Sequence, residues 1–178
     1  MRQNIIIGMT RKEFFYSKLY SVLTMAFIAT CLYTVSTIII GIANTDGYDL
    51  ELIMDNNFAI IRYLLLCLGY MSFAFMLAFI IRKGTLTILF YFLYVMMLEP
   101  IFMLIHVYYF KNSSRNYWPM NSIEDLMPFP LFKLPDYFVN KEWDFSILLP
   151  YSHAMGMTIL YSTIFILIAY RSFMKRDI

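Results

Sequence analysis

Four long runs of apolar residues dominate the hydropathy pattern of the chain. They extend over residues 19–43, 58–81, 85–110 and 148–170. A helix needs roughly 20 apolar residues to cross the hydrocarbon core of a bilayer, so each run is long enough to span it. The alternating segments of about 10 residues that form membrane β-barrels do not occur in the sequence. We therefore expect an all-α integral membrane protein with four transmembrane helices in a single domain, residues 1–178.

Lysine and arginine residues predict the orientation of these spans. They are concentrated before the first span, in the turn 82–84 and in the tail after the fourth span. The short loop 44–57 has four acidic residues and no lysine or arginine, and the long loop 111–147 has mixed charge. Because lysine and arginine are retained on the cytoplasmic side of membranes, both termini are expected to be cytoplasmic.

The composition excludes several classes of soluble protein. Hydrophobic residues make up 61% of the chain and charged residues 15%, whereas a soluble domain has about 45–50% and about 25%. The net charge of +2 is too small to indicate a nucleic acid or another polyanion as partner. The two cysteines, Cys31 and Cys67, lie inside apolar runs and indicate neither a disulfide framework nor a zinc site. We expect no cofactor.

Sequence motifs of catalysis and nucleotide binding are absent. None of the six glycines belongs to a Gly-x4-Gly-Lys-Ser/Thr loop, so the chain has no P-loop to bind ATP phosphates. His-Glu-x-x-His, Gly-x-Ser-x-Gly and Cys-x-x-Cys do not occur either. The sequence therefore does not predict an enzyme, and energy from ATP would have to come from another subunit.

The segment before the first span contains a predicted bend. Thr10 and Glu13 have the spacing of a capping box, in which each side chain accepts the backbone N–H of the other residue. Gly8 is placed where a short helix over residues 2–7 would end. A short helix, a glycine and a longer helix thus form a corner with apolar and basic side chains. These residues alone leave two interpretations open, an interfacial anchor on acidic lipid and a docking site for a soluble partner.

The same segment resembles a known family. Residues 4–18 read NIIIGMTRKEFFxxK, which is similar to the segment between the second and third spans of ABC-2 type transporter permeases. In that family a short coupling helix at this place docks on the ATP-binding subunit. The Glu99–Pro100 pair and the outer segment 117–126 also resemble recurring features of the family. The resemblance implies that seven residues contact an ATP-binding-cassette ATPase: Ile5, Ile6, Ile7, Met9, Arg11, Lys12 and Phe14.

The order of spans and loops after this segment is also similar to that of ABC-2 permeases. The resemblance implies a permease subunit of an ATP-driven exporter in the bacterial cytoplasmic membrane, with a second permease copy or a related permease as partner. Such permeases have six spans and the match begins after the second. We therefore expect an amino-terminally incomplete permease or a shortened relative. The alternative is a small four-helix membrane protein that binds or scaffolds partners without transport.

Small residues form a stripe along the first predicted span. Their spacing of three or four residues puts them on one face of the helix, and such faces let neighbouring backbones approach closely in lipid. The stripe predicts either helix–helix packing or the lining of a translocation path. It consists of Ala26, Thr30, Thr34, Thr37 and Gly41.

Three ionisable residues inside the predicted spans are candidate functional groups, namely Arg62, Glu99 and His106. Glu99 is expected near the middle of the bilayer, where a charged carboxylate is costly, so we expect a protonated carboxyl bonded to a neighbouring hydroxyl. Pro100 cannot donate a backbone N–H and predicts a kink beside it. Arg62 and His106 are expected in an outer polar layer. Glu99 is interpreted either as a hinge contact in the translocation path or as a structural hydrogen bond between two helices.

The long outer loop 111–147 contains several aromatic and proline residues. Asn121 or Ser122 is expected to cap a short helix that ends at Leu126 or Met127. The loop is interpreted as a lid over an exit path or as an interfacial plug without substrate contact.

Overall fold

The computed structural model describes residues 8–45, 58–128 and 148–175, and most of them are helical. No strand occurs among the described residues, so the predicted all-α fold is confirmed. The elements in chain order are α2 (Arg11–Asn44), α4 (Phe58–Ile81), α5 (Gly84–Leu93), the π-helix η1 (Tyr94–Leu98), α6 (Glu99–Phe110), the 3₁₀-helix η2 (Ser113–Tyr117), α7 (Pro119–Glu124) and α8 (Tyr151–Met174).

Four helical units are long and apolar enough to cross a membrane, as the hydropathy pattern predicted. The third unit consists of α5, η1 and α6 in succession. The fourth begins at Tyr151 rather than at residue 148, because Pro150 precedes it with a ψ of 139°, outside the helical region. The four units are Arg11–Asn44, Phe58–Ile81, Gly84–Phe110 and Tyr151–Met174.

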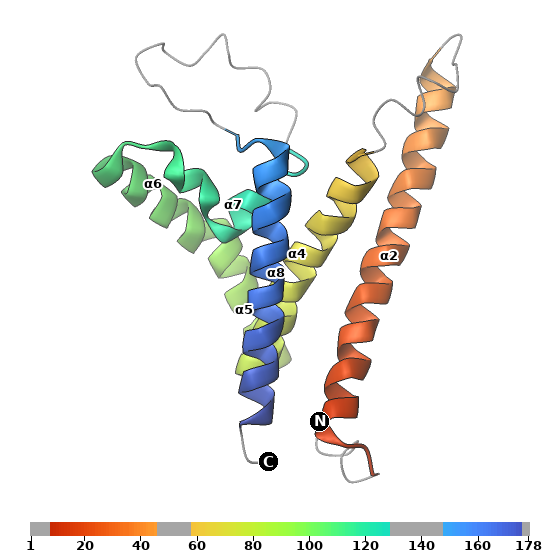
Figure 1. Cartoon of the computed structure of the whole chain (residues 1–178), viewed down its shortest axis with the longest axis vertical. Helices are drawn as coiled ribbons and strands as arrows, with labels where there is room; N and C mark the ends of the chain where they lie inside the picture. Colours follow the sequence, from red (N-terminus) through yellow and green to blue (C-terminus); the bar gives the residue numbers. More distant parts are fainter. Residues whose placement is uncertain (1–7, 46–57, 129–147, 176–178) are drawn as a thin grey trace.

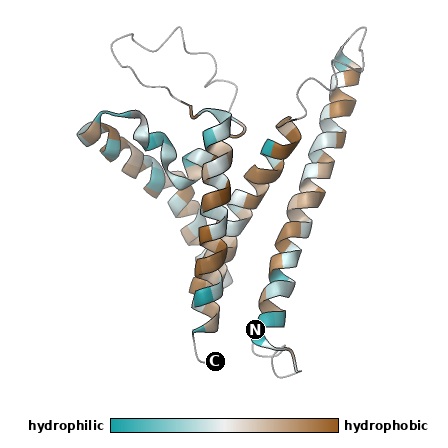
Figure 2. Cartoon of the chain, viewed as in Figure 1, coloured by the Kyte–Doolittle hydropathy of each residue, from teal (hydrophilic) through white to brown (hydrophobic). Residues whose placement is uncertain are grey.

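α4 is the centre of the bundle. α8 packs along α4, α2 contacts α4 on another side, and α5 lies against α4 after the tight turn between them. The start of α2, the end of α4 and the end of α8 lie together at one end of the molecule, and α6 diverges from α8 towards the opposite end (Figure 1). Hydrophilic residues gather at the start of α2 and at the end of α8 (Figure 2). We call this end, which carries Lys12, Lys83 and Lys175, the basic end.

An aromatic cluster joins three helices at the basic end. Phe15 of α2 is only 1% exposed, and its ring centroid lies 5.3 Å from the rings of Phe75 and Phe79 in α4. It also lies 5.2 Å from the ring of Tyr170 in α8. Buried aromatic rings at such distances add packing energy to that of their buried area. The cluster therefore fixes the start of α2 to α4 and α8, and its buried rings are those of Phe14, Phe15, Phe75, Phe79 and Phe173.

The stripe of small residues contributes to packing over only part of its length. Ala26 and Thr30 are buried, whereas Thr37 and Gly41 are exposed. The hydroxyl of Thr30 donates to the carbonyl of Ala26 at 2.8 Å, and those of Thr34 and Thr37 also donate to carbonyls of their own helix. The packing interpretation therefore holds for the half of the stripe nearer the basic end. The hydroxyls of all three threonines are already bonded within α2.

The third span changes its winding beside the Glu99–Pro100 pair, where the sequence predicts a kink. Residues of η1 are wound as a π-helix, and the backbone N–H of Glu99 donates to the carbonyl of Tyr94, five residues earlier. Pro100 has no N–H to offer the carbonyl of Met96. Single π-helical turns within longer helices are frequent at functional sites. The predicted irregularity is confirmed, and it takes the form of a π-turn before Glu99.

Candidate functional site

A segment between α6 and α8 is inserted into the bundle. This inserted segment, residues 113–127, contains η2 and α7, and α7 contacts both α4 and α8. Ile123 of α7 is fully buried and lies against Gly69 of α4, where a Cβ atom would be 2.8 Å from its Cγ1. Gly69 is 11 residues from the start of α4, which corresponds to about 16 Å along the helix. The inserted segment therefore reaches well below the end of the bundle that is opposite to the basic end (Figure 1).

Glu99 caps the first turn of α7 from a different helix. The first N–H groups of a helix have no partner within it, and a side-chain acceptor usually satisfies them. Trp118, the residue before α7, provides no such side-chain bond. Instead, Oε1 of Glu99 accepts the backbone N–H of Asn121 at 2.9 Å. A backbone amide is therefore one partner of Glu99, and the hydroxyl of Tyr94 lies beside the same carboxyl, where the sequence predicts a neighbouring hydroxyl.

The other carboxyl oxygen of Glu99, Oε2, has different surroundings from Oε1. The Glu99 side chain is only 1% exposed. The hydroxyl of Tyr94 and the amide of Met120 lie near the carboxyl. Nevertheless, Oε2 has no partner at hydrogen-bond distance among the described residues. A buried polar atom without a partner raises the free energy of the folded state. Such an atom is therefore retained only where other contacts hold it in place or where it has a function.

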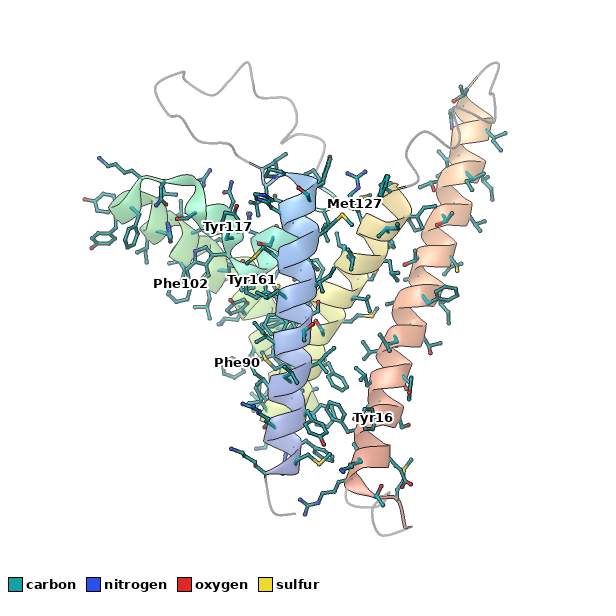
Figure 3. The ribbon with its side chains drawn as sticks, in the orientation of Figure 1. Tyr16, Phe90, Phe102, Tyr117, Met127 and Tyr161 are labelled. Atoms are coloured by element: carbon teal, nitrogen blue, oxygen red, sulfur yellow. The ribbon has the colours of Figure 1, made fainter. Side chains whose placement is uncertain are left out.

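Polar contacts from α4 and α8 hold the inserted segment on its other sides. The hydroxyl of Tyr70 in α4 donates to Oε1 of Glu124 at 2.8 Å. The hydroxyl of Tyr161 in α8 donates to the carbonyl of Tyr117 at 2.7 Å, and both tyrosines are labelled in Figure 3. Apolar contact adds to these bonds, since the rings of Phe102 in α6 and Trp118 are stacked with centroids 5.7 Å apart. The inserted segment is thus bonded or packed to α4, α6 and α8.

Asp125 joins the end of α7 to the start of the last span. Its side chain is 4% exposed, and Oδ2 accepts the backbone N–H of Leu149 at 2.9 Å and the Nδ2–H of Asn121 at 3.0 Å. Burial raises the pKa of Asp125 to about 6, whereas the hydrogen bond from Leu149 acts in the opposite direction. The carboxyl of Asp125 therefore holds together two parts of the chain that are 24 residues apart.

The predicted start of the short helix is wrong. Asn121 and Ser122 are inside α7, which begins at Pro119. Proline is favoured in the first turn because that turn does not need its missing N–H. The side chain of Asn121 instead donates to the carbonyl of Asn116 and to Asp125. The Trp118–Pro119 step was the signal in the sequence for this helix start.

Arg62 and His106, predicted to form an outer polar layer, each contact a different residue in the structure. The guanidinium of Arg62 lies over the ring of Tyr151, with its Cζ 4.0 Å from the ring centroid. Nε2 of His106 is 3.1 Å from Oδ1 of Asn112 and 3.0 Å from Oγ of Ser114. Arg62 therefore joins α4 to the start of α8, and His106 holds the turn after α6.

The second candidate site is the corner, residues 8–13, at the basic end. The capping box is confirmed: the N–H of Glu13 donates to Oγ1 of Thr10 at 3.3 Å, and the N–H of Thr10 donates to Oε2 of Glu13 at 2.8 Å. Gly8 has a φ of 103°, in the left-handed region that glycine adopts without strain. Met9 is 37% exposed, and Lys12 is exposed as well.

The prediction that Phe14 is a docking contact at the surface of the corner is wrong. Phe14 is buried in the aromatic cluster, with its ring centroid 5.8 Å from that of Phe173. It is therefore a core residue and not a surface contact, because α8 covers the face of α2 on which it lies. Ile5, Ile6 and Ile7 lie outside the described residues.

The chemistry of the described residues gives no sign of a metal or redox centre. Among residues 8–45, 58–128 and 148–175, no group of three or more His, Cys, Asp or Glu side chains is placed to hold a metal ion. Cys31 and Cys67 are free thiols.

The fold defines a multi-pass membrane protein with four apolar helices. No family model, curated protein or solved structure significantly matches the chain.

Proposed function

We propose that this chain is a permease subunit of an ATP-driven exporter of the ABC-2 type. In this proposal it forms part of a translocation path in the bacterial cytoplasmic membrane, with both termini in the cytoplasm. A separate ATP-binding-cassette ATPase docks at the corner, and a second permease copy or a related permease completes the path. The chain itself neither binds nor hydrolyses ATP.

The single observation that carries the proposal is the attachment of the corner to the bundle. Met9 is exposed at the corner, and five residues later the chain enters the aromatic cluster at Phe14. Through Phe15, this cluster contacts both α4 and α8. A partner that pushed on the corner would therefore displace the ends of three spans together, because packed aromatic rings transmit displacement without yielding. Coupling ATP hydrolysis to movement in the membrane requires such an attachment.

The inserted segment supports the same proposal at the opposite end. Glu99 lies directly after the π-turn and caps α7, so a bend at η1 would move the cap away from Asn121. A hinge whose movement frees an inserted helix is a suitable gate for an export path. In this proposal, the Glu99 contact is part of a hinge in the translocation path.

The test is association with an ATP-binding-cassette subunit encoded beside this chain's gene. The two proteins are co-expressed, and the chain is purified through an affinity tag. We expect the subunit to co-purify with the wild-type chain and with Met9→Leu, but not with Met9→Asp or Ile6→Asp. All four chains should insert into the membrane in equal amounts. Equal recovery of the subunit with Met9→Asp and Ile6→Asp would contradict docking at the corner.

A non-transporting binding or scaffold subunit is the second candidate function. One observation favours it: the hydroxyl hydrogens of Thr30, Thr34 and Thr37 are donated within α2, so these groups are not free to donate to a solute. A chain that binds its partners and never stimulates ATP hydrolysis would support this candidate.

A further inference from the structure

Two carboxyl groups, those of Glu99 and Glu124, lie at the depth of the middle of the spans. Glu99 precedes the end of α6 at Phe110 by 11 residues, which corresponds to about 16 Å along a helix. Glu124 accepts the hydroxyl of Tyr70, which lies 12 residues from the start of α4, or about 18 Å. The carboxyl of Glu124 also acts electrostatically on that of Glu99. The two groups therefore belong to one site.

Glu124 is exposed, although it lies at the depth of the hydrocarbon core. The hydroxyl of Tyr70 holds its Oε1 at 2.8 Å, but a neutral hydroxyl does not offset a negative charge. A charged side chain at this depth is costly in contact with lipid. Such side chains face the interior of a bundle or a water-filled cavity, where they mark the path of a substrate or an ion. We therefore expect Glu124 to face a polar space.

The described arginines at this end of the bundle have other partners. The guanidinium of Arg62 lies over the ring of Tyr151, and the charge of Arg115 acts on Asp125. Two carboxylates as close as those of Glu99 and Glu124 repel each other in apolar surroundings, and a positive charge between them would relieve the repulsion. The pair is therefore suited to a cation that comes from outside the chain.

Oε2 of Glu99 is a second polar atom to which a ligand can bind. The Glu99 side chain is only 1% exposed, and Oε1 is occupied by the N–H of Asn121. Oε2 has no partner at hydrogen-bond distance among the described residues. A buried polar atom in this state gains free energy when a polar or charged group comes beside it. The site thus combines an exposed carboxylate with a buried carboxyl oxygen that is not satisfied.

Aromatic rings complete the surroundings of Glu124. Tyr70 of α4 bonds to it directly, and Tyr91 of α5 is close enough for the charge of Glu124 to act on its hydroxyl. Both tyrosines are half-buried, and both pack against the buried side chains of Phe73 and Ile123. The faces of tyrosine rings attract cations, most strongly where water is partly excluded.

This combination of groups favours an organic cation over a metal ion. Within residues 8–45, 58–128 and 148–175, no group of three or more His, Cys, Asp or Glu side chains is placed to hold a metal ion. Aromatic rings beside a carboxylate instead recognise ammonium groups. Apolar side chains of the same cluster, among them Leu77 and Val95, are suited to an apolar remainder of the ligand.

We propose that Glu124, Tyr70 and Tyr91, together with Oε2 of Glu99, form a binding site for the ammonium group of an amphipathic organic cation. Glu124 provides the charge, the two rings provide cation–π contact, and the neighbouring apolar side chains hold the body of the ligand. The inference rests on the proposed function in one respect, because it names such cations as the class of exported substrate. Binding itself requires only this chain.

The test measures binding to the purified full chain in nanodiscs of phosphatidylcholine, with the signal of empty nanodiscs subtracted. Three fluorescent probes share a dansyl group and an alkyl chain, and they end in trimethylammonium, in hydroxyl or in carboxylate. We expect wild type to bind the trimethylammonium probe about tenfold more tightly than the hydroxyl probe, and the carboxylate probe most weakly.

Two variants on different elements test the site. Glu124→Gln keeps an oxygen that can accept the hydroxyl of Tyr70 and removes only the charge. We expect it to lose the preference for the trimethylammonium probe, a decrease in affinity of about tenfold, with binding of the hydroxyl probe unchanged. Tyr91→Leu removes a ring and should weaken the trimethylammonium probe by about fivefold. Glu13→Gln and Tyr20→Leu are the matched controls, because both lie on α2, and they should bind as wild type does.

Three outcomes would overturn the inference. The first is equal affinity of wild type for the trimethylammonium and hydroxyl probes, which would mean partition by apolar contact alone. The second is wild-type binding of the trimethylammonium probe by Glu124→Gln, even if the pH dependence of unfolding changes, because the pair would then hold a proton and not an organic cation. The third is an equal loss of all probes in Glu124→Gln without a selective loss in Tyr91→Leu, which would mean disturbed packing.

Failure of the proposed function gives a different result. If the ATP-binding subunit does not co-purify with the chain but the trimethylammonium probe binds as expected, the proposed function fails and the binding site stands. If the subunit docks and the probes bind equally, only the inference fails. Stimulation of ATP hydrolysis by the trimethylammonium probe in the wild-type complex, and its loss in Glu124→Gln, would support both.

Discussion

Oε1 of Glu99 accepts the backbone N–H of Asn121 at 2.9 Å, although the two residues are 22 positions apart. The bond joins the first residue of α6 to the first turn of α7. The same glutamate uses its own backbone N–H to close the π-turn with Tyr94. Winding of the third span and placement of the inserted segment therefore depend on one residue.

Substitution of Glu99 separates its two interpretations. Glutamine keeps an acceptor for the N–H of Asn121, and we expect it to behave nearly as wild type. Leucine leaves that N–H without its partner, which costs about 1–3 kcal/mol for a buried donor. We expect Glu99→Leu to insert normally but to lose coupled ATP hydrolysis in the complex with the ATPase. If the complex with Glu99→Leu hydrolyses ATP at the normal rate, Glu99 has no functional role in coupling. If Glu99→Leu fails to accumulate in the membrane, the bond from Asn121 to Glu99 is structural.

The contact between Gly69 and Ile123 predicts a steric effect. An alanine Cβ at position 69 would lie 2.8 Å from Cγ1 and 2.9 Å from Cδ1 of Ile123. Overpacking of this kind typically costs about 1–3 kcal/mol. Gly69→Ala should therefore lower the thermal unfolding temperature in detergent, and adding Ile123→Ala should reverse part of the loss. Gly156→Ala is the matched control, because its Cβ meets no atom within 4 Å, and it should be neutral or slightly stabilising. A Gly69→Ala protein as stable as wild type would show that α7 is not packed in this way.

The raised pKa of Asp125 predicts a pH dependence. Its pKa of about 6 in the folded chain lies above its ordinary value of 3.8. A raised pKa means that the folded state binds the proton more tightly, so this contribution to stability is fully present below about pH 4. It is lost as the pH rises through about 6. Wild type should therefore gain stability between pH 7.5 and pH 5 relative to Asp125→Asn, which cannot titrate. Parallel unfolding curves for the two proteins across this range would contradict the assignment.

Phe15 should be the most sensitive position at the basic end. It is 1% exposed and contacts rings of both α4 and α8. Truncation of a buried phenylalanine costs about 3–5 kcal/mol, so Phe15→Ala should unfold at a much lower temperature. Tyr16, the next residue, is 47% exposed, and Tyr16→Ala should have little effect. Similar losses for the two variants would mean that α2 does not pack on the bundle through this face.

Topology can be tested by labelling single cysteines in intact cells. Lys111 and Lys83 are exposed at opposite ends of the third span. With both termini in the cytoplasm, Lys111→Cys should react with an impermeant maleimide from outside, and Lys83→Cys only after the cells are opened. Labelling of Lys83→Cys in intact cells would reverse the proposed orientation.

The spans and the capping box are predictable from the sequence, because both depend on residues close together in the chain. Hydropathy over about 20 residues determines whether a helix crosses a bilayer. Thr10 and Glu13 are three residues apart, and their bonds need no distant partner. The irregular winding beside Pro100 is predictable for the same reason, since proline removes a local hydrogen bond.

Two features were not predictable because they depend on contacts between distant residues. Phe14 resembles a surface residue in the sequence of the corner, but Phe173 covers it from the last helix. Asn121 has the side chain of a typical helix cap. Glu99 in the preceding span takes that role instead, and Asn121 bonds to Asp125. No local pattern distinguishes these cases, because the partners are brought together only by the packing of helices.

The π-turn at η1 has a consequence for the rotational phase of the third span. A π-turn accommodates one residue more than regular α-helical winding, and one residue corresponds to a rotation of about 100° around the helix axis. The faces of α5 and α6 are therefore out of phase by that angle, although the two helices are continuous. Removing a single residue from the stretch Tyr94–Leu98 would restore the phase and leave the length sufficient to cross the bilayer. The deletion would keep Glu99 facing Asn121, because the extra residue and the wide turn that accommodates it disappear together.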